Sequence, residues 1–399
     1  MVGEGRDEED GRANPLNTAN SDCDALGTEI VILNPQPLQR FTDHEKDVVD
    51  LSWSNTGYLI SGSLDKTARL WHPSRPVCLS IFRHAEAVTS VSFNPKEDKF
   101  FLSGGFDKKL RVWNIPNGRV AEWAQAPAVI TAATYNPSGD AIVAGLYDGR
   151  VLFYSFDGDK LTYFTQIKTK QKGKKQGKKV TGLTFLRHLS EDKVTDHAPA
   201  RGSPNSSKRN GVARYVRSLR TSTKIKKVKQ QLLITTNDSR LRLVGMNDYC
   251  FVRKYKGHSN TSLQIRARFS ESGEFIISGS ESRGACTIWN TATKRNPLNV
   301  NVTGINMYDK VKAREWFEAT TADPPIVTDA SFAPSSSVQK AMLRSGLFST
   351  LGSLNHINED FSSAVMVTCD YEGTMRVFLR RSCIDRVSHA AGPGGYISG

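Results

Sequence analysis

A repeat of about 42 residues is the feature that most constrains how this chain folds. Asp107 follows Asp65 after 42 residues and Asp148 follows after a further 41, while Trp71 and Trp113 are also 42 residues apart. Repeats of this length are typical of propeller blades, which are small sheets that bury their faces only against neighbouring sheets. We therefore expect the units to stack radially around an axis.

Each unit contains short runs of alternating or β-branched residues separated by turn formers, which predicts an all-β protein. The first three units read VVDLSW, YLISGS and TARLWH; then VTSVSF, FFLSGG and KLRVWN; then ITAATY, AIVAGL and RVLFYS. Three further units begin at VTGLTF, QIRARFS and VTDASFAP. Six repeats are therefore recognisable.

The ends of the repeat array leave the blade number open, and we expect seven blades. A degenerate seventh unit has two candidate sources, the segment 290–325 and the chain termini. Segment 29–41 has strand character, so we expect it to complete the last blade as an outer strand. The propeller is then assigned to 36–380, between a disordered, polar and acidic tail (1–35) and a flexible C-terminal tail (381–399).

The net charge of +14 is concentrated in one part of the chain. Residues 160–230 hold 20 Lys and Arg against three acids, a net of +17, so the remainder carries −3. This stretch contains a basic loop, 168–179, and an insertion, 187–230. A third insertion, 336–360, has apolar residues that favour a helix packed on the rim.

Strand order predicts that the two basic segments leave opposite faces of the propeller. Loop 168–179 precedes an inner strand, whereas insertion 187–230 separates a first strand from a second. A solvated, disordered loop is the simplest interpretation of both, and an anionic membrane surface is the main alternative, ahead of nucleic acid. The candidate contacts for an anionic partner are Lys174, Lys175, Lys178, Lys179, Arg214, Arg217, Arg220, Lys226 and Lys227.

Polar residues recur at fixed places in the units and predict structural hydrogen-bond sets. A His, a strand hydroxyl, a turn Asp and an indole N–H can form one hydrogen-bonded chain, and a device that recurs with the repeat belongs to the fold rather than to catalysis. The two complete sets are His44, Ser61, Asp65 and Trp71, and His84, Ser103, Asp107 and Trp113. Later units keep them only in part; one of these has His258.

No catalytic, metal or cofactor motif accompanies the repeats. The six cysteines stand far apart, without a metal-ligand spacing, and we expect reduced thiols. There is no nucleophile elbow or phosphate loop, and the acids recur as turn residues. We therefore expect neither an enzyme nor a bound cofactor or metal.

Several ordered motifs resemble those of the WD-repeat family, and more narrowly of its Rab-binding members. The resemblance extends from about residue 41 to residue 378 and rests on DLSWS (50–54), SLDKTARLWH (63–72), FFLSGGFDKKLRVWNIP (100–116), YDGRVLFY (147–154), TNDSRLRL (236–243) and KYKGHSNTSLQI (254–265). It implies a seven-bladed scaffold that engages a GTP-loaded Rab GTPase in endosomal or Golgi traffic. It assigns no Rab-binding motif to numbered residues.

The function expected from the sequence is therefore a non-enzymatic protein-interaction scaffold, a Rab effector or adaptor. The chain starts without an apolar signal core and nowhere has 18 consecutive apolar residues, so we expect a cytoplasmic protein, and a monomeric propeller. The resemblance further implies a peripheral place on endosomal or Golgi membranes. An RNA-associated WD-repeat scaffold, nuclear or in ribosome biogenesis, is the alternative, using the basic loops.

Overall fold

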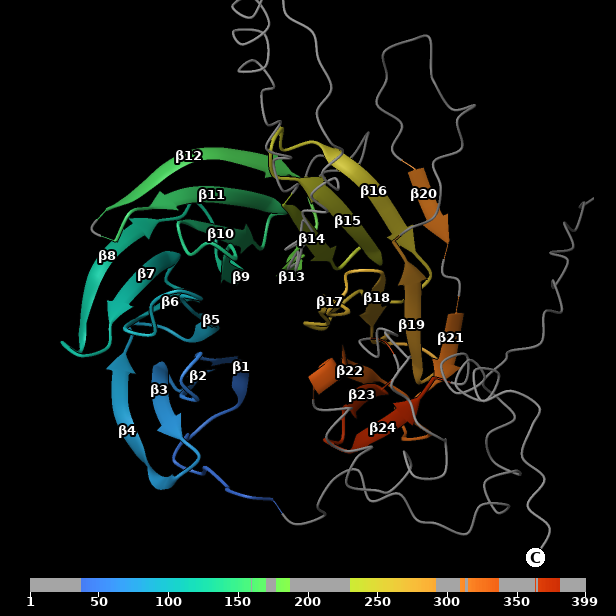
Figure 1. Cartoon of the computed structure of the whole chain (residues 1–399), viewed down its shortest axis with the longest axis horizontal. Helices are drawn as coiled ribbons and strands as arrows, with labels where there is room; N and C mark the ends of the chain where they lie inside the picture. The colour runs from blue at the N-terminus through green and yellow to red at the C-terminus, as the bar shows by residue number, and fades with distance from the viewer. Residues whose placement is uncertain are drawn as a thin grey trace, which may run out of the picture.

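Six small sheets, here called blades 1 to 6, are arranged around an axis in chain order (Figure 1). The computed structural model describes residues 37–158, 160–169, 177–186, 230–291, 309–312, 315–336, 363 and 365–380. Within each blade the first strand lies nearest the axis and each later strand pairs antiparallel with the one before it, apart from an added strand in blade 4. The predicted all-β propeller is thus confirmed, with a six-bladed arrangement.

Blades 1 to 3 have four strands each. Blade 1 is β1 (Val48–Trp53), β2 (Leu59–Ser63), β3 (Thr67–His72) and β4 (Arg75–Arg83); blade 2 is β5 (Val88–Phe93), β6 (Phe100–Gly105), β7 (Lys109–Asn114) and β8 (Arg119–Gln125); blade 3 is β9 (Ile130–Tyr135), β10 (Ala141–Leu146), β11 (Arg150–Phe156) and β12 (Leu161–Lys168). β4, β8 and β12 are outer strands absent from the three-strand pattern predicted for each unit.

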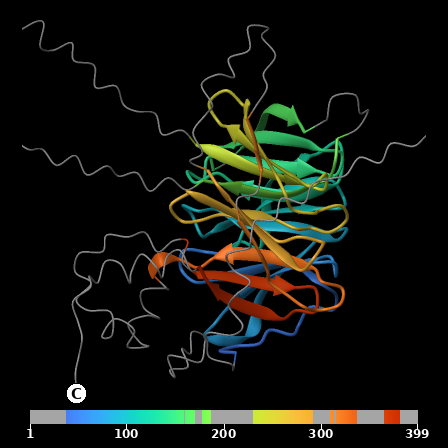
Figure 2. The same ribbon diagram turned by 90° about the vertical axis from the view of Figure 1, so that its right-hand side faces the viewer.

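Blades 4 to 6 are less regular and lie together on the near side in Figure 2. Blade 4 is β13 (Val180–Phe185), β14 (Gln231–Thr236), β15 (Arg240–Gly245), β16 (Phe251–Lys256) and β20 (Asp309–Lys312); blade 5 is β17 (Ala267–Phe269), β18 (Phe275–Ser278), β19 (Ala285–Asn290) and β21 (Glu315–Glu318); blade 6 is β22 (Val327–Phe332), β23 (Val365–Asp370) and β24 (Met375–Leu379). β20 joins blade 4 by pairing parallel with β16. No helix among the described residues is long and apolar enough to cross a membrane.

The expectation of seven blades is not met by the described residues, which form six. The described part of segment 290–325 makes no blade of its own: it supplies β20 to blade 4 and β21 to blade 5, where these strands pair with the backbone hydrogen-bonding groups of the outer sheet edges. The termini, the other candidate source, lie outside the described residues. Of segment 29–41, only 37–41 are described, and they form no strand.

Buried side chains fill the spaces between consecutive blades. Five clusters of fully buried hydrophobic residues each combine side chains of two neighbouring blades; between blades 1 and 2, for example, Ile60 and Phe82 meet Phe101 and Trp113. In the described part of the chain no such cluster joins blade 6 to blade 1, and Figure 1 shows β22 and β1 across an open side of the ring. Each blade therefore depends on its neighbours for its core.

A glycine in the second strand recurs where two blades approach most closely. A Cβ on Gly104 would lie 2.4 Å from Ile130 Cγ2 of the next blade, and one on Gly145 would lie 2.4 Å from Val180 Cγ1. Glycine therefore allows these blades to pack this closely, since real Cβ atoms essentially never lie so near another heavy atom.

Substituting Gly104→Ala is expected to lower the free energy of unfolding by about 1–3 kcal/mol, because the new methyl group overpacks the contact with Ile130. Urea unfolding measures the loss. In an Ile130→Ala background, which removes the opposing methyl group, the same substitution should cost clearly less. Equal costs in both backgrounds would contradict the close-packing explanation.

Candidate protein-interaction surface

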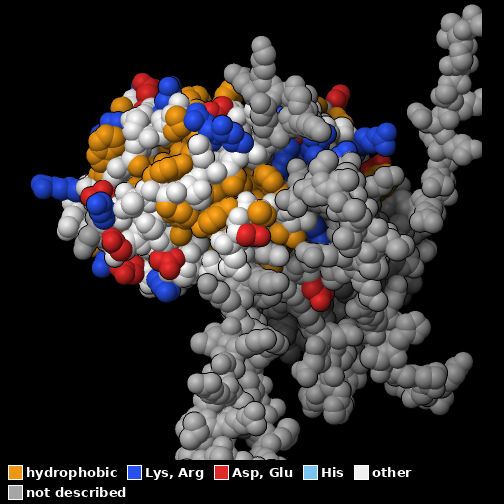
Figure 3. Space-filling model, turned by 90° about the horizontal axis from the view of Figure 1, so that it is seen from above, with side chains coloured by type: hydrophobic (Ala, Val, Ile, Leu, Met, Phe, Trp, Pro, Cys, Tyr) orange, Lys and Arg blue, Asp and Glu red, His pale blue; other side chains and the backbone are white. Residues whose placement is uncertain are grey.

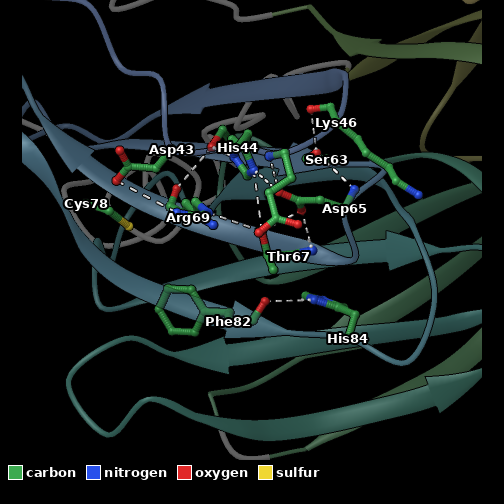
Figure 4. Close-up of polar contacts among 12 residues, drawn as sticks. Asp43, His44, Lys46, Ser63, Asp65, Thr67, Arg69, Cys78, Phe82 and His84 are labelled. Atoms are coloured by element: carbon green, nitrogen blue, oxygen red, sulfur yellow. Dashed lines mark hydrogen bonds and ion pairs between the residues drawn. The ribbon is translucent and has the colours of Figure 1, made fainter.

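The first polar set is assembled in full and joins the loop before blade 1 to two of its strands. Figure 4 shows two of its members, His44 and Asp65. His44 lies between Asp65 and Ser61: its Nδ1 is 2.7 Å from Asp65 Oδ2 and its Nε2 is 2.6 Å from Ser61 Oγ. Trp71 Nε1 donates to the same hydroxyl at 2.8 Å. Burial alone would raise the pKa of Asp65, but hydrogen bonds from Thr67 and His44 outweigh it and lower that pKa to about 2.

The second set brings three of its four residues together. His84 Nε2 and Trp113 Nε1 lie 2.8 and 2.9 Å from Ser103 Oγ. Asp107 is not part of this chain, because it forms an ion pair with Arg111 at 2.5 Å while His84 Nδ1 lies 3.1 Å from the carbonyl oxygen of Phe82 (Figure 4). Burial and the Arg111 charge lower the pKa of His84 to about 4.

In blade 5 the corresponding histidine, His258, is buried. Neither of its ring nitrogens has a hydrogen-bond partner among the residues that the structure describes, and its ring packs edge-on against Trp289. Gly279 stands ten residues before Trp289, where Ser61 and Ser103 precede their tryptophans, so no hydroxyl is available. Burial lowers the pKa of His258 to about 4.

A carboxylate instead fixes the loop that follows His258. Glu281 accepts hydrogen bonds from the backbone N–H groups of Thr261, Ser262 and Leu263 at 2.6–2.8 Å. Burial raises its pKa, but these bonds and the Thr261 hydroxyl outweigh the burial and lower it to about 2. The loop leading into the central channel is thus held by the blade 5 turn.

That loop supplies two long polar side chains to the central channel. Gln264 Nε2 donates to the carbonyl oxygens of Thr131 and Thr181, in blades 3 and 4. Arg266 reaches across to blade 1, where it forms an ion pair with the buried Asp50. The sequence signal for this role is QIRARFS, the one predicted inner strand with two arginines.

The channel opens as a cavity of about 580 Å³ on the face away from the His44 loop. Inner strands of all six blades line it, and hydroxyls such as Ser92 and Thr184 alternate with short apolar side chains. Its charged groups are largely paired, since Arg266 bonds Asp50 and Arg268 bonds Asp329 at 2.7 Å. The cavity therefore presents mainly neutral polar groups to a partner.

The opposite face, which we call the turn face, carries the β2–β3, β6–β7 and β10–β11 turns and exposed aromatic side chains. Phe106 and Tyr147 immediately precede the turn acids of blades 2 and 3, and Tyr371 occupies the matching place in blade 6. Their exposed fractions are 53, 64 and 59 %. Large aromatic side chains repeated around one face are suited to anchoring a protein partner.

A second apolar area follows the rim of the propeller. Figure 3 looks onto part of this rim and shows hydrophobic side chains gathered among charged ones. The outer strands carry exposed Ile81, Trp123, Tyr163 and Phe164. Lys109 covers the Trp123 ring, with its Nζ 4.6 Å from the ring centroid.

The ends of the two basic segments lie on opposite faces. Thr169 N donates to Gly149 O, and Lys179 O accepts from Asn237 N, so both ends of loop 168–179 lie on the turn face. Leu186 lies against Gly273 in a turn of the other face, where insertion 187–230 begins. Of the predicted anionic-partner contacts, Lys178 and Lys179 are described; Lys174, Lys175, Arg214, Arg217, Arg220, Lys226 and Lys227 lie outside the described residues, as does nearly all of insertion 336–360.

The cysteines and acids of the described region form neither disulfides nor a metal-binding group. Cys78, Cys250, Cys286 and Cys369 are free thiols, and burial raises the pKa of the Cys286 thiol. No group of three His, Cys, Asp or Glu side chains within the described residues is placed to hold a metal ion.

Comparison with known proteins agrees with this architecture. The family model "WD domain, G-beta repeat" matches residues 35–72, 76–114 and 249–290. WD repeat-containing protein 44 of Xenopus laevis is 32% identical over 93% of this chain, and an uncharacterised WD repeat-containing protein of Schizosaccharomyces pombe is 28% identical over 68% of it. The 2-deoxy-glucose resistant protein 2 of Saccharomyces cerevisiae is 48% identical over 15% of the chain.

The chain spans only part of these relatives: 38% of the Xenopus protein, 40% of the Schizosaccharomyces protein and 7% of the Saccharomyces protein. The similarity to the Xenopus protein nevertheless covers almost the whole chain, propeller included. Together with the matched repeats and the six blades, it shows that this chain belongs to the WD-repeat family of β-propellers.

Proposed function

We propose that this chain is a non-enzymatic protein-interaction scaffold that acts as an effector or adaptor of a GTP-loaded Rab GTPase. The observation that carries the proposal is the similarity to WD repeat-containing protein 44 over 93% of the chain, joined to the motifs that resemble the Rab-binding WD-repeat proteins. WD-repeat propellers generally mediate protein–protein interactions. In this proposal the protein is cytoplasmic and peripheral on endosomal or Golgi membranes.

The turn face is the docking surface that we favour for the GTPase. Its exposed Phe106, Tyr147 and Tyr371 come from different blades, so one partner lying across the face contacts several of them at once. These side chains contribute little to the stability of the fold, because they lie in turns and are more than half exposed. Such residues are free to serve binding, where aromatic anchors contribute most of the affinity.

A pull-down with a panel of Rab GTPases, each loaded with a GTP analogue or GDP, tests the proposal. We expect retention of one Rab in its GTP form only. The double substitution Phe106→Ala and Tyr147→Ala should weaken that retention by on the order of a thousandfold, since each aromatic anchor is worth about 2 kcal/mol. Trp123→Ala, an equally exposed aromatic residue on the rim, should leave it unchanged.

Failure to retain any Rab in either nucleotide state would overturn the effector role. Salt-dependent retention of RNA would instead favour the alternative, an RNA-associated scaffold that uses the basic loops. Retention that weakens equally with Trp123→Ala would place the docking surface on the rim.

A further inference from the structure

Blade 1 exposes apolar side chains on the side of the ring that faces blade 6 (Figure 1), at positions that its sister blades bury. Strands β1, β5 and β9 each have six residues, and the first, fourth and sixth of them are apolar. In β1 these residues, Val48, Leu51 and Trp53, are 45–58% exposed, whereas the equivalent residues of β5 and β9 are at most 6% exposed. The preceding blade buries the residues of β5 and β9, and among the described residues β1 has no preceding blade against it.

Blade 6 is exposed at the matching place on the other side of this opening. Met375 on β24 is 62% exposed. Cross-strand pairing gives it the position that Ala68, Leu110 and Val151 hold in blades 1 to 3, and all three are fully buried against the next blade. Each side of the opening thus lacks the neighbour that completes its core. We call Val48, Leu51, Trp53 and Met375 together the open side.

The stretch before β1 indicates what kind of element is missing. The family matches at 76–114 and 249–290 each combine the outer strand of one blade with the three inner strands of the next, which are β4 with β5 to β7 and β16 with β17 to β19. The match at 35–72 combines β1 to β3 with the stretch ahead of them in the same way. Residues 37–41 therefore hold the place of an outer strand.

Aromatic packing supports this assignment. The ring centroids of Phe41 and Trp71 are 4.9 Å apart, and those of Phe82, on the outer strand of blade 1, and Trp113 of blade 2 are 5.3 Å apart. Phe41 thus packs on blade 1 as the outer strand of a preceding blade would. The three inner strands of that blade are absent from the described residues, in which 37–41 pair with no strand.

Neither terminal segment of the chain has the sequence for these three strands. The inner strands and their turns take 25 residues in blade 1 (48–72) and 27 in blade 2 (88–114). The terminal segment 381–399 has only 19 residues. The segment 1–36 is long enough but contains one strand-forming apolar run, EIVIL at 29–33, which suffices for a single strand. The source of the missing sheet is therefore sought in another molecule.

We propose that the open side binds a three-stranded antiparallel sheet of another polypeptide, apolar on both faces, to which residues 37–41 add the outer strand. One face of this sheet packs on Val48, Leu51 and Trp53 and the other on Met375, so that the ring closes with a further blade. Strands buried on both faces have nearly continuous apolar runs, which is the sequence pattern expected of the partner. The test of this proposal does not depend on binding of a Rab GTPase.

A second copy of the inner strands of blade 2 provides a stand-in for the missing sheet. Residues 84–118, which contain these strands, are inserted between residues 35 and 36 of the whole chain. We expect the midpoint of thermal unfolding to rise by on the order of 5–10 °C, because the inserted sheet removes large apolar side chains from water. Acrylamide quenching of Trp53, measured as the difference from the matching Trp53→Phe variant, should decrease.

Two glutamate substitutions show whether the gain comes from the open side. Trp53→Glu should abolish the gain from the insertion, but should change the stability of the chain without the insertion little, because Trp53 is exposed there. Trp123→Glu, at a similarly exposed tryptophan on the rim, should leave the gain intact. An insertion without any gain, or a gain that both substitutions remove equally, would overturn the proposal.

The unaltered chain shows whether the open side is free for another polypeptide. We expect it to sediment as a monomer in which acrylamide reaches Trp53. If Trp53 is instead shielded in the monomer, a segment of the same chain already covers the open side. If the chain is a dimer that Trp53→Glu dissociates, a second copy is the occupant. Either of these results contradicts the proposal.

Discussion

Replacing Asp50 with alanine is expected to destabilise the propeller by about 3–5 kcal/mol, because it leaves a desolvated arginine unpaired. Asp50 is almost fully buried and accepts hydrogen bonds from Ser90 Oγ at 2.7 Å and from Val91 N at 2.9 Å. Its other oxygen pairs with Arg266, whose Nη2 is buried and has no hydrogen-bond partner within the described part of the chain. One carboxylate thus connects blades 1, 2 and 5.

Urea unfolding of Asp50→Ala measures this loss. In the double variant Asp50→Ala with Arg266→Met both charges are gone, and most of the stability should return. Asp329→Ala is the matched control, because its ion pair with Arg268 is 41–46% exposed and should contribute no more than about 1 kcal/mol. If Asp50→Ala and Asp329→Ala lower the free energy of unfolding by the same amount, Asp50 does not hold the channel together.

Between pH 6.5 and pH 4 the folded protein is expected to lose stability through His84 and His258. Each has an ordinary pKa of 6.5 that the fold lowers to about 4, so the unfolded chain binds the proton more tightly. Stability is therefore complete above pH 6.5, falls as the pH decreases, and stops falling below pH 4. The shift corresponds to about 3 kcal/mol for each histidine.

The buried position in blade 5 provides the clearest test of this pH dependence. His258→Phe keeps the edge-on packing against Trp289 and removes the titrating group, so the variant should lose about 3 kcal/mol less between pH 6.5 and pH 4. Urea midpoints measured across that range give the slope. If the urea midpoints of His258→Phe and of the parent chain decrease equally with pH, His258 is not a source of the pH dependence.

The inner strands of each blade could be predicted from the sequence because most of them are buried and regularly spaced. The run FFLSGG coincides with β6, and AIVAGL with β10, since strands buried on both faces leave continuous apolar runs. The set of His44, Ser61, Asp65 and Trp71 could be placed for the same reason: the repeat fixes their positions relative to the turns. All of these features depend on local spacing.

The features that sequence reasoning missed depend on contacts between distant segments. β4, β8 and β12 alternate exposed residues with half-buried ones and lack a strong apolar period, so they were not recognised as strands. The pair Asp50 and Arg266 joins residues more than two hundred positions apart, which no local pattern encodes.

The excursion of β20 changes how independently the blades behave. The chain completes β19 in blade 5, adds β20 to the edge of blade 4, and then returns to blade 5 as β21. In most repeat proteins each unit contacts its neighbours only through its packed face, and parts of the array can unfold locally. Here the segment between two strands of blade 5 is also hydrogen-bonded to the edge of blade 4, so the outer strands of both blades belong to one stretch of chain. We therefore expect blades 4 and 5 to open together, as one cooperative unit.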